Sequence, residues 1–307
     1  MVPLSHSAPA VPRFAALKVA AGAVCISFAA VFVKVVDVGP TAAGFYRMLF
    51  GGAALLVILV VRRERLRTSA LAFALAAACG VFFALDLAFW HQSIHYVGPG
   101  LATILANFQV FFMAAVGVLF LRERLSWRLV VAIAAAFGGM YLVVGVKWGQ
   151  LAATFKWGIL LGLITALCYT AFLLTLRRVR RLPPASRPTV MGTVVIISFV
   201  SAGCLAAFVA LRGESFAIPD GGTAATLVAY GLVGQVLGWV LISSGVPGME
   251  ASRLGLLLLL QPSLAFVWDM LFFGRPTTAL DVVGVAAALA AIYLGATARR
   301  SSSTTAP

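Results

Sequence analysis

Two ionisable side chains lie deep inside long apolar stretches of the sequence, where charges are rare and usually functional. Arg47 lies within the apolar stretch 40–61, and Asp86 lies within the stretch 69–91. If the two stretches are neighbouring antiparallel membrane helices, with a rise of about 1.5 Å per residue, the two side chains reach a similar depth. Two interpretations remain open: a salt bridge that fixes the helices, or a functional pair in which Arg47 binds a carboxylate and Asp86 carries a proton.

Aromatic and amide side chains recur at helical spacing within the same kind of stretch. Phe82, Asp86 and Trp90 are four residues apart, as are Gln235, Trp239 and Ser243, so each trio would share one helix face. Ligand pockets combine aromatic walls with a few polar groups, although amides and hydroxyls can also hold neighbouring helices together. We expect a substrate-binding cavity formed by ten residues: Tyr46, Phe82, Trp90, His91, Asn107, Tyr169, Gln235, Trp239, Ser243 and Gln261.

The sequence contains little that is typical of metal binding or of enzymatic activity. His91 and His95 have the spacing of a helical metal-binding pair, but zinc sites normally need three or four protein ligands, and no third ligand is close by. The pair is expected where a membrane span meets the outer loop. Phosphate-binding G-x-x-x-x-G-K-[ST], H-E-x-x-H and G-x-S-x-G motifs are all missing from the sequence. We therefore expect no metal, no cofactor and no enzymatic activity.

The chain is too apolar for a soluble domain. Of its 307 residues, 62% are hydrophobic and 10% are charged, whereas soluble domains carry about 25% charged residues. A helix that crosses a bilayer needs about 20 apolar residues, and only helices or closed barrels satisfy their backbone in lipid. The sequence predicts an all-α polytopic membrane protein with ten transmembrane helices, at residues 14–36, 40–61, 69–91, 98–121, 127–146, 157–177, 188–211, 223–243, 251–273 and 279–298.

Lys and Arg residues are unevenly distributed between the loops on the two sides of this bundle. With a cytoplasmic N-terminus, seventeen lie on the inner side; the outer side has only Lys34, Lys147, Lys156, Arg212 and Arg275. Because cytoplasmic loops carry the excess of Lys and Arg, both termini are expected in the cytoplasm. The net charge of +14 is then explained by loops that face anionic lipid headgroups. Nucleic acid is not an expected partner.

The second half of the chain repeats the first. A shift of 152 positions places Leu105–Leu142 on Leu257–Leu294 without a gap. The most informative matches are polar: Gln109 with Gln261, and Tyr141 with Tyr293. Because five spans, an odd number, precede the second copy, the copies cross the membrane in opposite directions, as in transporters that bind substrate at a repeat interface. We expect two inverted five-helix repeats, over residues 13–146 and 156–298, around a central cavity.

Pairs of small residues indicate close helix packing. Gly158-x-x-x-Gly162 and Gly234-x-x-x-Gly238 each place two glycines on one helix face, where two backbones can approach in lipid. Packing within a single chain explains both pairs, so a monomer is the simpler expectation, with a dimer interface as the alternative.

The junction after the fourth span carries a family resemblance. Residues 119–126 read LFLRERLS and, with the two five-span repeats, resemble the ten-span EamA-type exporters of the drug/metabolite transporter superfamily. Residues 273–277 of the second repeat read FGRPT and depart from that pattern. Within the family, the chain is most similar to bacterial inner-membrane exporters of aromatic and other amino acids. The resemblance implies a ten-helix basket around a central cavity, with both termini cytoplasmic.

These observations predict a secondary transporter that works by alternating access. It would export a small zwitterionic metabolite, and the first candidate is an amino acid. Its partners would be the small-molecule substrate and the lipid bilayer. An exporter of cationic drugs or quaternary ammonium compounds is the nearest alternative, because Asp86 supplies the buried carboxylate that it would need. A membrane anchor without transport activity, or a lipid-modifying enzyme, is the alternative from another class of proteins.

Overall fold

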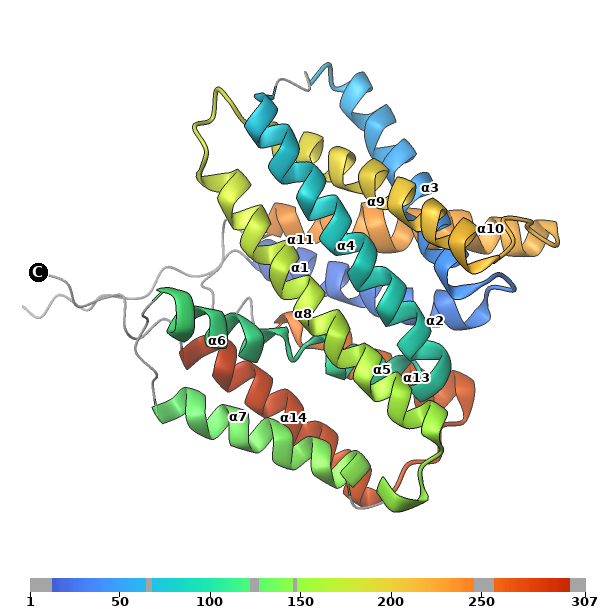
Figure 1. Ribbon diagram of the computed structural model, residues 1–307, viewed down its shortest axis with the longest axis vertical. Helices are drawn as coiled ribbons and strands as arrows, with labels where there is room; N and C mark the ends of the chain where they lie inside the picture. Colours follow the sequence, from blue (N-terminus) through green and yellow to red (C-terminus); the bar gives the residue numbers. More distant parts are fainter. Residues whose placement is uncertain (1–12, 65–67, 122–126, 146–147, 246–256, 299–307) are drawn as a thin grey trace, which may run out of the picture.

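The computed structural model describes residues 13–64, 68–121, 127–145, 148–245 and 257–298, and every regular element within these ranges is a helix (Figure 1). Seven helical segments are long and apolar enough to cross a membrane, and three shorter apolar helices, Val130–Val143, Leu260–Phe273 and Ala279–Leu294, accompany them. The predicted fold class, an all-α membrane protein with ten helical segments around a central cavity, is confirmed.

In the first half, the residues that the structure describes form seven α-helices, one π-helical turn and one 3-10 turn. They are α1 (Arg13–Ser27), α2 (Ala29–Val35), α3 (Pro40–Val61), α4 (Ala70–Val97), α5 (Pro99–Ala106), α6 (Gln109–Leu121), α7 (Trp127–Met140), the π-helical η1 (Tyr141–Gly145) and the 3-10 turn η2 (Trp148–Gln150).

The described residues of the second half form six α-helices and one π-helical segment. They are α8 (Ala153–Arg181), α9 (Val190–Arg212), α10 (Gly221–Tyr230), the π-helical η3 (Gly231–Leu237), α11 (Gly238–Gly245), α13 (Leu260–Phe273) and α14 (Ala279–Ala298).

Three of the seven long segments are not continuous α-helices. Phe14–Val35 is divided between α1 and α2 at Phe28, Pro99–Leu119 is divided between α5 and α6 at Asn107 and Phe108, and Gly221–Ile242 contains η3. Irregular backbone at membrane depth is tolerated where it is buried in protein or faces a cavity. In transporters, such interruptions are characteristic of the substrate site.

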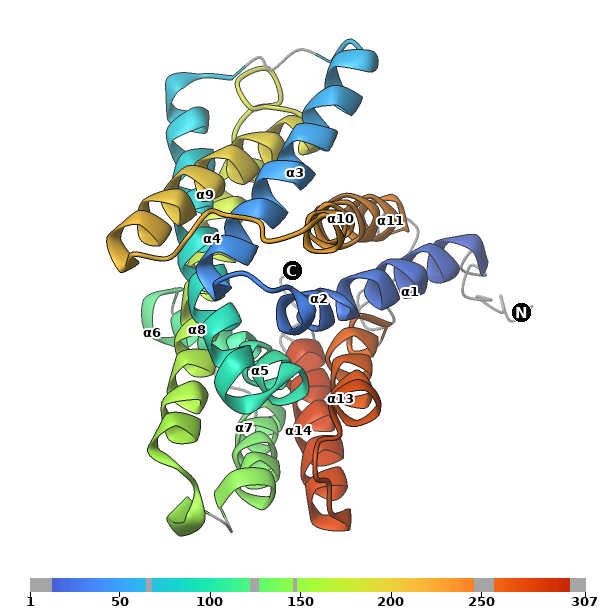
Figure 2. The same ribbon diagram turned by 90° about the vertical axis from the view of Figure 1, so that its right-hand side faces the viewer.

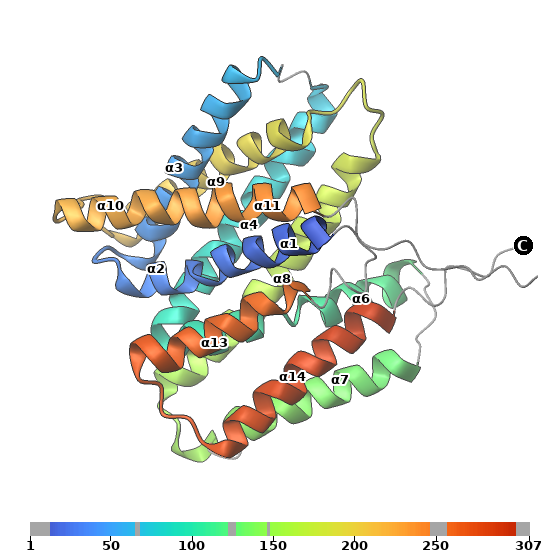
Figure 3. The ribbon, with the colours of Figure 1, turned by 180° about the vertical axis from the view of Figure 1, so that it is seen from behind.

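The two ends of the bundle differ in the loops that they contain. Helix α1 begins and α14 ends on one face, which we call the terminal face, on the right of Figure 3. The opposite face, which we call the far face, contains the start of α3, the junction of α4 and α5, and the end of α13 (Figure 2).

Helices from the two halves pack against each other throughout the bundle. Helix α4 packs along α8 and α9, α3 along α9, α1 along α11, and α7 along α14 (Figure 1). Glycines permit the closest of these contacts. A Cβ added to Gly158 would lie 2.5 Å from the Cβ of Tyr96, and one added to Gly139 would lie 2.6 Å from the carbonyl oxygen of Gly284. The expected role of Gly158 in packing within the chain is therefore what the structure shows.

Two carboxylates of the second half cap helices of the first half on the far face. Glu214, just after α9, accepts hydrogen bonds from the backbone N–H groups of Thr41 and Ala42 (3.1 and 3.3 Å) and from the Thr41 hydroxyl (2.6 Å). These groups open α3, where the first N–H groups have no partner in the helix. A negative charge at this end is further stabilised by the helix dipole.

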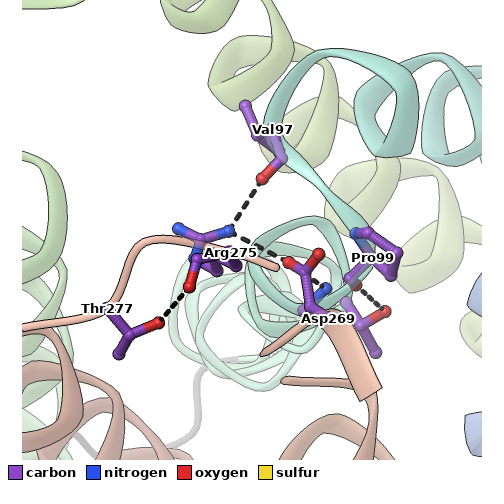
Figure 4. Close-up of polar contacts among 7 residues, drawn as sticks. Val97, Pro99, Asp269, Arg275 and Thr277 are labelled. Atoms are coloured by element: carbon purple, nitrogen blue, oxygen red, sulfur yellow. Dashed lines mark hydrogen bonds and ion pairs between the residues drawn. The ribbon is translucent and has the colours of Figure 1, made fainter. Parts of the chain in front are cut away.

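Asp269 of α13 does the same for α5. Its Oδ2 accepts from the N–H of Gly100 (3.1 Å) and pairs with Arg275 (3.1 Å), whose guanidinium also donates to the carbonyl oxygen of Val97 (2.9 Å; Figure 4). The last residue of α4 and the first turn of α5 are thereby tied to the end of α13. We call the groups around Glu214 and Asp269 the far-face caps.

The ends of α3 and α9 are locally alike. Arg63 and Gly213 both adopt the left-handed conformation, with φ of 54° and 66°. The glutamate that follows each, Glu64 or Glu214, donates its N–H back to the helix, to Leu59 and Val209 respectively. A left-handed residue costs little at glycine and more at arginine.

Candidate functional site

A cavity of about 220 Å³ lies between helices of both halves. Ligand sites of roughly 300–1,000 Å³ accommodate drug-sized molecules, so this volume suits a small metabolite. Its walls come from α1 to α6, α8, α11 and α13. Residues of the predicted set that line it are Arg47, Asp86, Trp90, Asn107, Tyr169, Trp239 and Gln261.

Breaks in regular helix shape this cavity. The α5–α6 break exposes Asn107 to it, and the Asn107 amide nitrogen donates to the carbonyl oxygen of Thr103 (2.8 Å). The backbone N–H of Asn107 donates to the same carbonyl oxygen (3.3 Å), so the main chain and the side chain of Asn107 together satisfy the end of α5. Gln109, the first residue of α6, and Gln261, on α13, line the cavity together, although they come from opposite halves of the chain.

Arg47 is buried without an acidic partner among the described residues. Its side chain is only 4% exposed, and its NH1 group donates to the hydroxyl of Tyr230 (3.1 Å). The guanidinium carbon lies 5.2 Å from the centroid of the Tyr230 ring, which is a cation–π contact. The Nε–H group of Arg47 has no hydrogen-bond partner. A guanidinium has five donors, so this cation still has donors to offer to an anion.

Asp86 lines the same cavity from α4. It is 7% exposed and makes no hydrogen bond or ion pair with any described residue. The salt bridge with Arg47, one of the two interpretations that the sequence left open, is therefore not formed. The reason is that Arg47 turns toward Tyr230 of α10, a residue that the sequence analysis did not consider.

Two further polar atoms in the cavity wall lack partners. They are the side-chain oxygen of Gln109 and the hydroxyl of Thr165, and both are buried. Buried polar atoms in folded proteins are nearly always hydrogen-bonded, so each exception needs an explanation. Both atoms therefore have hydrogen-bonding capacity that a polar ligand in the cavity can use.

Aromatic side chains form the apolar part of the wall. Trp90 and Phe83 come from α4, Tyr169 from α8 and Trp239 from α11. Phe172 supports two of them from behind, since its ring lies 5.0 Å from that of Phe83 and 5.4 Å from that of Tyr169. Aromatic surfaces of this kind hold flat apolar groups by stacking.

Four of the predicted residues lie outside the cavity wall. Tyr46 donates to the carbonyl oxygen of Phe216 near the far face. His91 is fully buried against Tyr230, and Phe82 is replaced in the wall by its neighbour Phe83. Gln235 donates to the Ser198 hydroxyl of α9 (3.3 Å).

Helix length and helix type explain these differences. Helix α4 continues to Val97, so His91 and His95 lie inside the span and not where it meets a loop. Gln235 lies in η3, where i→i+5 hydrogen bonding breaks the four-residue periodicity on which its prediction depended. The side chain of Ser243 lies outside the described residues, as does the junction 122–126.

The residues that the sequence analysis missed carry weak signals. Tyr230 stands in an apolar helix whose polar neighbour at helical spacing is the small Thr226, and Thr165 is one of several hydroxyls in the long helix α8. Gln109 was visible as the symmetry mate of Gln261, and this was the one usable signal. Within the part of the chain that the structure describes, no group of three His, Cys, Asp or Glu side chains could hold a metal ion.

A multi-pass helical bundle with interrupted spans and a polar cavity between its halves belongs to the class of membrane transporters. The comparison with protein families agrees, because the EamA-like transporter family matches residues 13–145 and again residues 156–297. The chain belongs to the EamA-like transporter family, and the resemblance noted in the sequence is confirmed. It is therefore a multi-pass membrane transporter of small molecules and not an enzyme.

Similarity to other proteins extends over most of the chain. An uncharacterized transporter, YxxF of Bacillus subtilis (strain 168), is 22% identical over 221 residues, which cover 71% of this chain and 68% of the relative. A protein of known crystal structure is similar with a TM-score of 0.64 at 16% identity, over 93% of this chain and 98% of that one. At this identity the likeness shows a shared fold.

Proposed function

We propose that the protein exports amino acids, aromatic ones among them, by alternating access. The observation that carries this proposal is that Arg47 and Asp86 line one cavity and do not pair with each other. A free amino acid carries a carboxylate and an ammonium group on one carbon. Arg47 would bind the carboxylate and Asp86 the ammonium, so each buried charge would gain the counter-ion that the protein does not provide.

The rest of the cavity supports the same class of substrate. Trp90, Tyr169 and Trp239 offer aromatic surfaces to a side chain, while Gln109 and Thr165 have unused polar atoms. A cationic drug would leave Arg47 without a counter-ion and would add a second positive charge to the cavity. Phosphate esters would find only one cation to neutralise them, where phosphate sites usually offer several donors.

The distribution of charge supports the sidedness of this proposal. The excess of Lys and Arg in the loops assigned to the inner side supports a cytoplasmic position for both termini, in a bacterial inner membrane. The two halves, residues 13–146 and 156–298, would rock about the cavity that lies between them. In this arrangement the far face opens outward, and amino acids leave the cell through it.

Flux in proteoliposomes tests the proposal. The purified full-length protein is assayed with labelled amino acids and with a cationic dye in one vesicle preparation, with and without a pH gradient. We expect flux of phenylalanine, and loss of that flux in Arg47→Met. Dye flux that survives Arg47→Met would establish a cation exporter instead, and the absence of any flux would favour a protein without transport activity. If Asp86→Asn preserves accumulation driven by the pH gradient, Asp86 is not the proton carrier.

A further inference from the structure

Tyr230 joins three helices through one phenol oxygen. It is fully buried at the end of α10, and its hydroxyl lies 3.1 Å from NH1 of Arg47 on α3 and 2.8 Å from Nε2 of His91 on α4. Neither Tyr230 nor His91 lines the cavity, whereas Arg47 does. Tyr230 thus contacts the guanidinium of Arg47 from outside the cavity.

The direction of the hydrogen bonds follows from the groups involved. A guanidinium can only donate, so the Tyr230 oxygen accepts from Arg47. The single phenol proton then needs an acceptor, because an unsatisfied buried hydroxyl is costly. Nε2 of His91 is the acceptor within reach. The chain of donors therefore runs from Arg47 through Tyr230 to His91.

The backbone around Tyr230 is held in a fixed relation to α3. Gly231, the next residue, begins η3, and a Cβ added to it would lie 2.9 Å from the backbone nitrogen of Gly51 and 3.2 Å from the carbonyl oxygen of Arg47. Gly51 meets Gly231 equally closely, since an added Cβ would lie 3.0 Å from the Gly231 oxygen. The two backbones touch within one turn of the Arg47–Tyr230 bond, so Tyr230 has little freedom to move relative to Arg47.

We propose that Tyr230 is a positioning residue that fixes the guanidinium of Arg47 for carboxylate binding. This inference rests on the proposed function, because it assigns Arg47 to the carboxylate of an amino acid. Tyr230 acts in two ways. Its ring stabilises the charge of Arg47 by a cation–π contact while the cavity is empty, and its hydroxyl occupies NH1, so that the remaining donors point to the cavity. His91 prevents the hydroxyl from rotating.

The test compares two tyrosine variants that each lose one buried hydroxyl. Tyr230→Phe keeps the ring and removes the bond to Arg47, and Tyr46→Phe on the same helix as Arg47 removes a hydroxyl that bonds to Phe216. The purified full-length protein in lipid nanodiscs is titrated with L-phenylalanine and with phenethylamine, which lacks the carboxylate. We expect Tyr230→Phe to bind phenylalanine about tenfold more weakly and phenethylamine unchanged, and Tyr46→Phe to bind both as the wild type does.

An equal loss for both ligands in Tyr230→Phe would overturn the proposal, because it would indicate general damage. Unchanged phenylalanine affinity in that variant, or an equal loss in Tyr46→Phe, would overturn it as well. His91→Gln keeps a side-chain acceptor for the Tyr230 hydroxyl and is expected to retain selectivity for phenylalanine. His91→Leu is expected to lose that selectivity in the same direction as Tyr230→Phe.

A second measurement does not depend on any substrate. Thermal unfolding of Arg47→Met, Tyr230→Phe and the double variant forms a double-mutant cycle. We expect strong non-additivity, because either single change already breaks the Arg47–Tyr230 bond; strict additivity would overturn the positioning role. If the wild type neither binds nor transports an amino acid while the cycle is non-additive, the proposed substrate fails and the pairing stands.

Discussion

Arg47 and Asp86 line the same cavity, and each is buried without the other as its ion-pair partner. This relationship distinguishes a site that awaits a charged ligand from a pair of charges that holds two helices together. A structural pair would be closed and satisfied. Here the guanidinium is held by a tyrosine, and the carboxylate has no hydrogen bond to any described residue.

The two charges are expected to select opposite halves of the substrate. Arg47→Met leaves Asp86 as the only charge of the pair and should favour phenethylamine, the amine half. Asp86→Asn leaves Arg47 and should favour 3-phenylpropionate, the carboxylate half. Each variant should lose phenylalanine binding by about 30-fold or more, as expected when one partner of a desolvated charge pair is removed. Titrations of both variants with the three ligands measure this; a shared ligand preference would contradict it.

Removing Arg47 is expected to cost no stability, in contrast to removing Arg275. Arg47 has no acidic partner, so replacement by Met relieves a buried charge and should leave the unfolding temperature equal or higher. Arg275→Met leaves Asp269 buried and unpaired, at a cost of about 3 kcal/mol. Thermal unfolding of the two purified variants, in the same detergent, provides the comparison. An equal loss of stability in both would contradict the absence of an acidic partner for Arg47 among the described residues.

Gly51→Ala is expected to disturb the site through packing alone. A Cβ at position 51 would lie 2.6 Å from the Cβ of Gln235. Helix α3 and η3 would therefore have to move apart close to the Arg47–Tyr230 hydrogen bond. We expect a loss of more than 1 kcal/mol in stability together with weaker phenylalanine binding. Gly203→Ala on α9 is the matched control, because nothing lies within 4 Å of its added Cβ. That variant should be unchanged, or stabilised by about 0.5 kcal/mol.

The far-face caps are expected to hold that face closed. Glu214→Gln and Asp269→Asn each weaken contacts that close the far face, at a cost of about 1 kcal/mol in stability. Both should speed labelling of a cysteine in the cavity, introduced as Thr103→Cys in a background without the native cysteines, by a membrane-impermeant thiol reagent added on the far side.

Asp220→Asn is the control for that experiment. Asp220 caps the start of α10 through hydrogen bonds from Thr223 of the same helix, and these bonds lower its pKa. Because asparagine also caps helices well, and because this cap joins nothing between the halves, the labelling rate should not change. A faster rate in Asp220→Asn would show that any change of charge on this face opens it.

The architecture was predictable from the sequence because it depends on composition and repetition. Long apolar stretches identified the spans, and the match of Gln109 with Gln261 identified two residues that do meet in one cavity. On α4 the prediction was wrong by one position, because Phe83 and not Phe82 lines the cavity. Neighbouring faces of an apolar helix carry similar residues, so the sequence does not distinguish them. No pattern in the sequence announces a π-helix, so the places of Gln235 and Tyr230 could not be predicted.

Hydrogen-bond partners on different helices could not be predicted from the sequence either. Asp269 lies in the last turns of α13, yet it is 3% exposed and caps α5, which no local pattern in the sequence indicates. Arg47 bonds to Tyr230 and not to Asp86 because of the place where α3 and α10 cross. The close contact between the backbones of Gly51 and Gly231 fixes that place. Hydrogen-bond partners of this kind are determined by tertiary packing, and they cannot be predicted from the local periodicity of the sequence.

The far-face caps make the two sides of the membrane unequal for the transporter. Both carboxylates belong to the second half, and the residue related to Asp269 by the repeat is Gly117, which has no side chain to cap a helix on the terminal face. A carrier made of two identical halves would expose its site to either side with the same frequency. This chain would rest with one side closed, so the concentration of substrate that half-saturates transport should differ between the two sides by the ratio of the two populations.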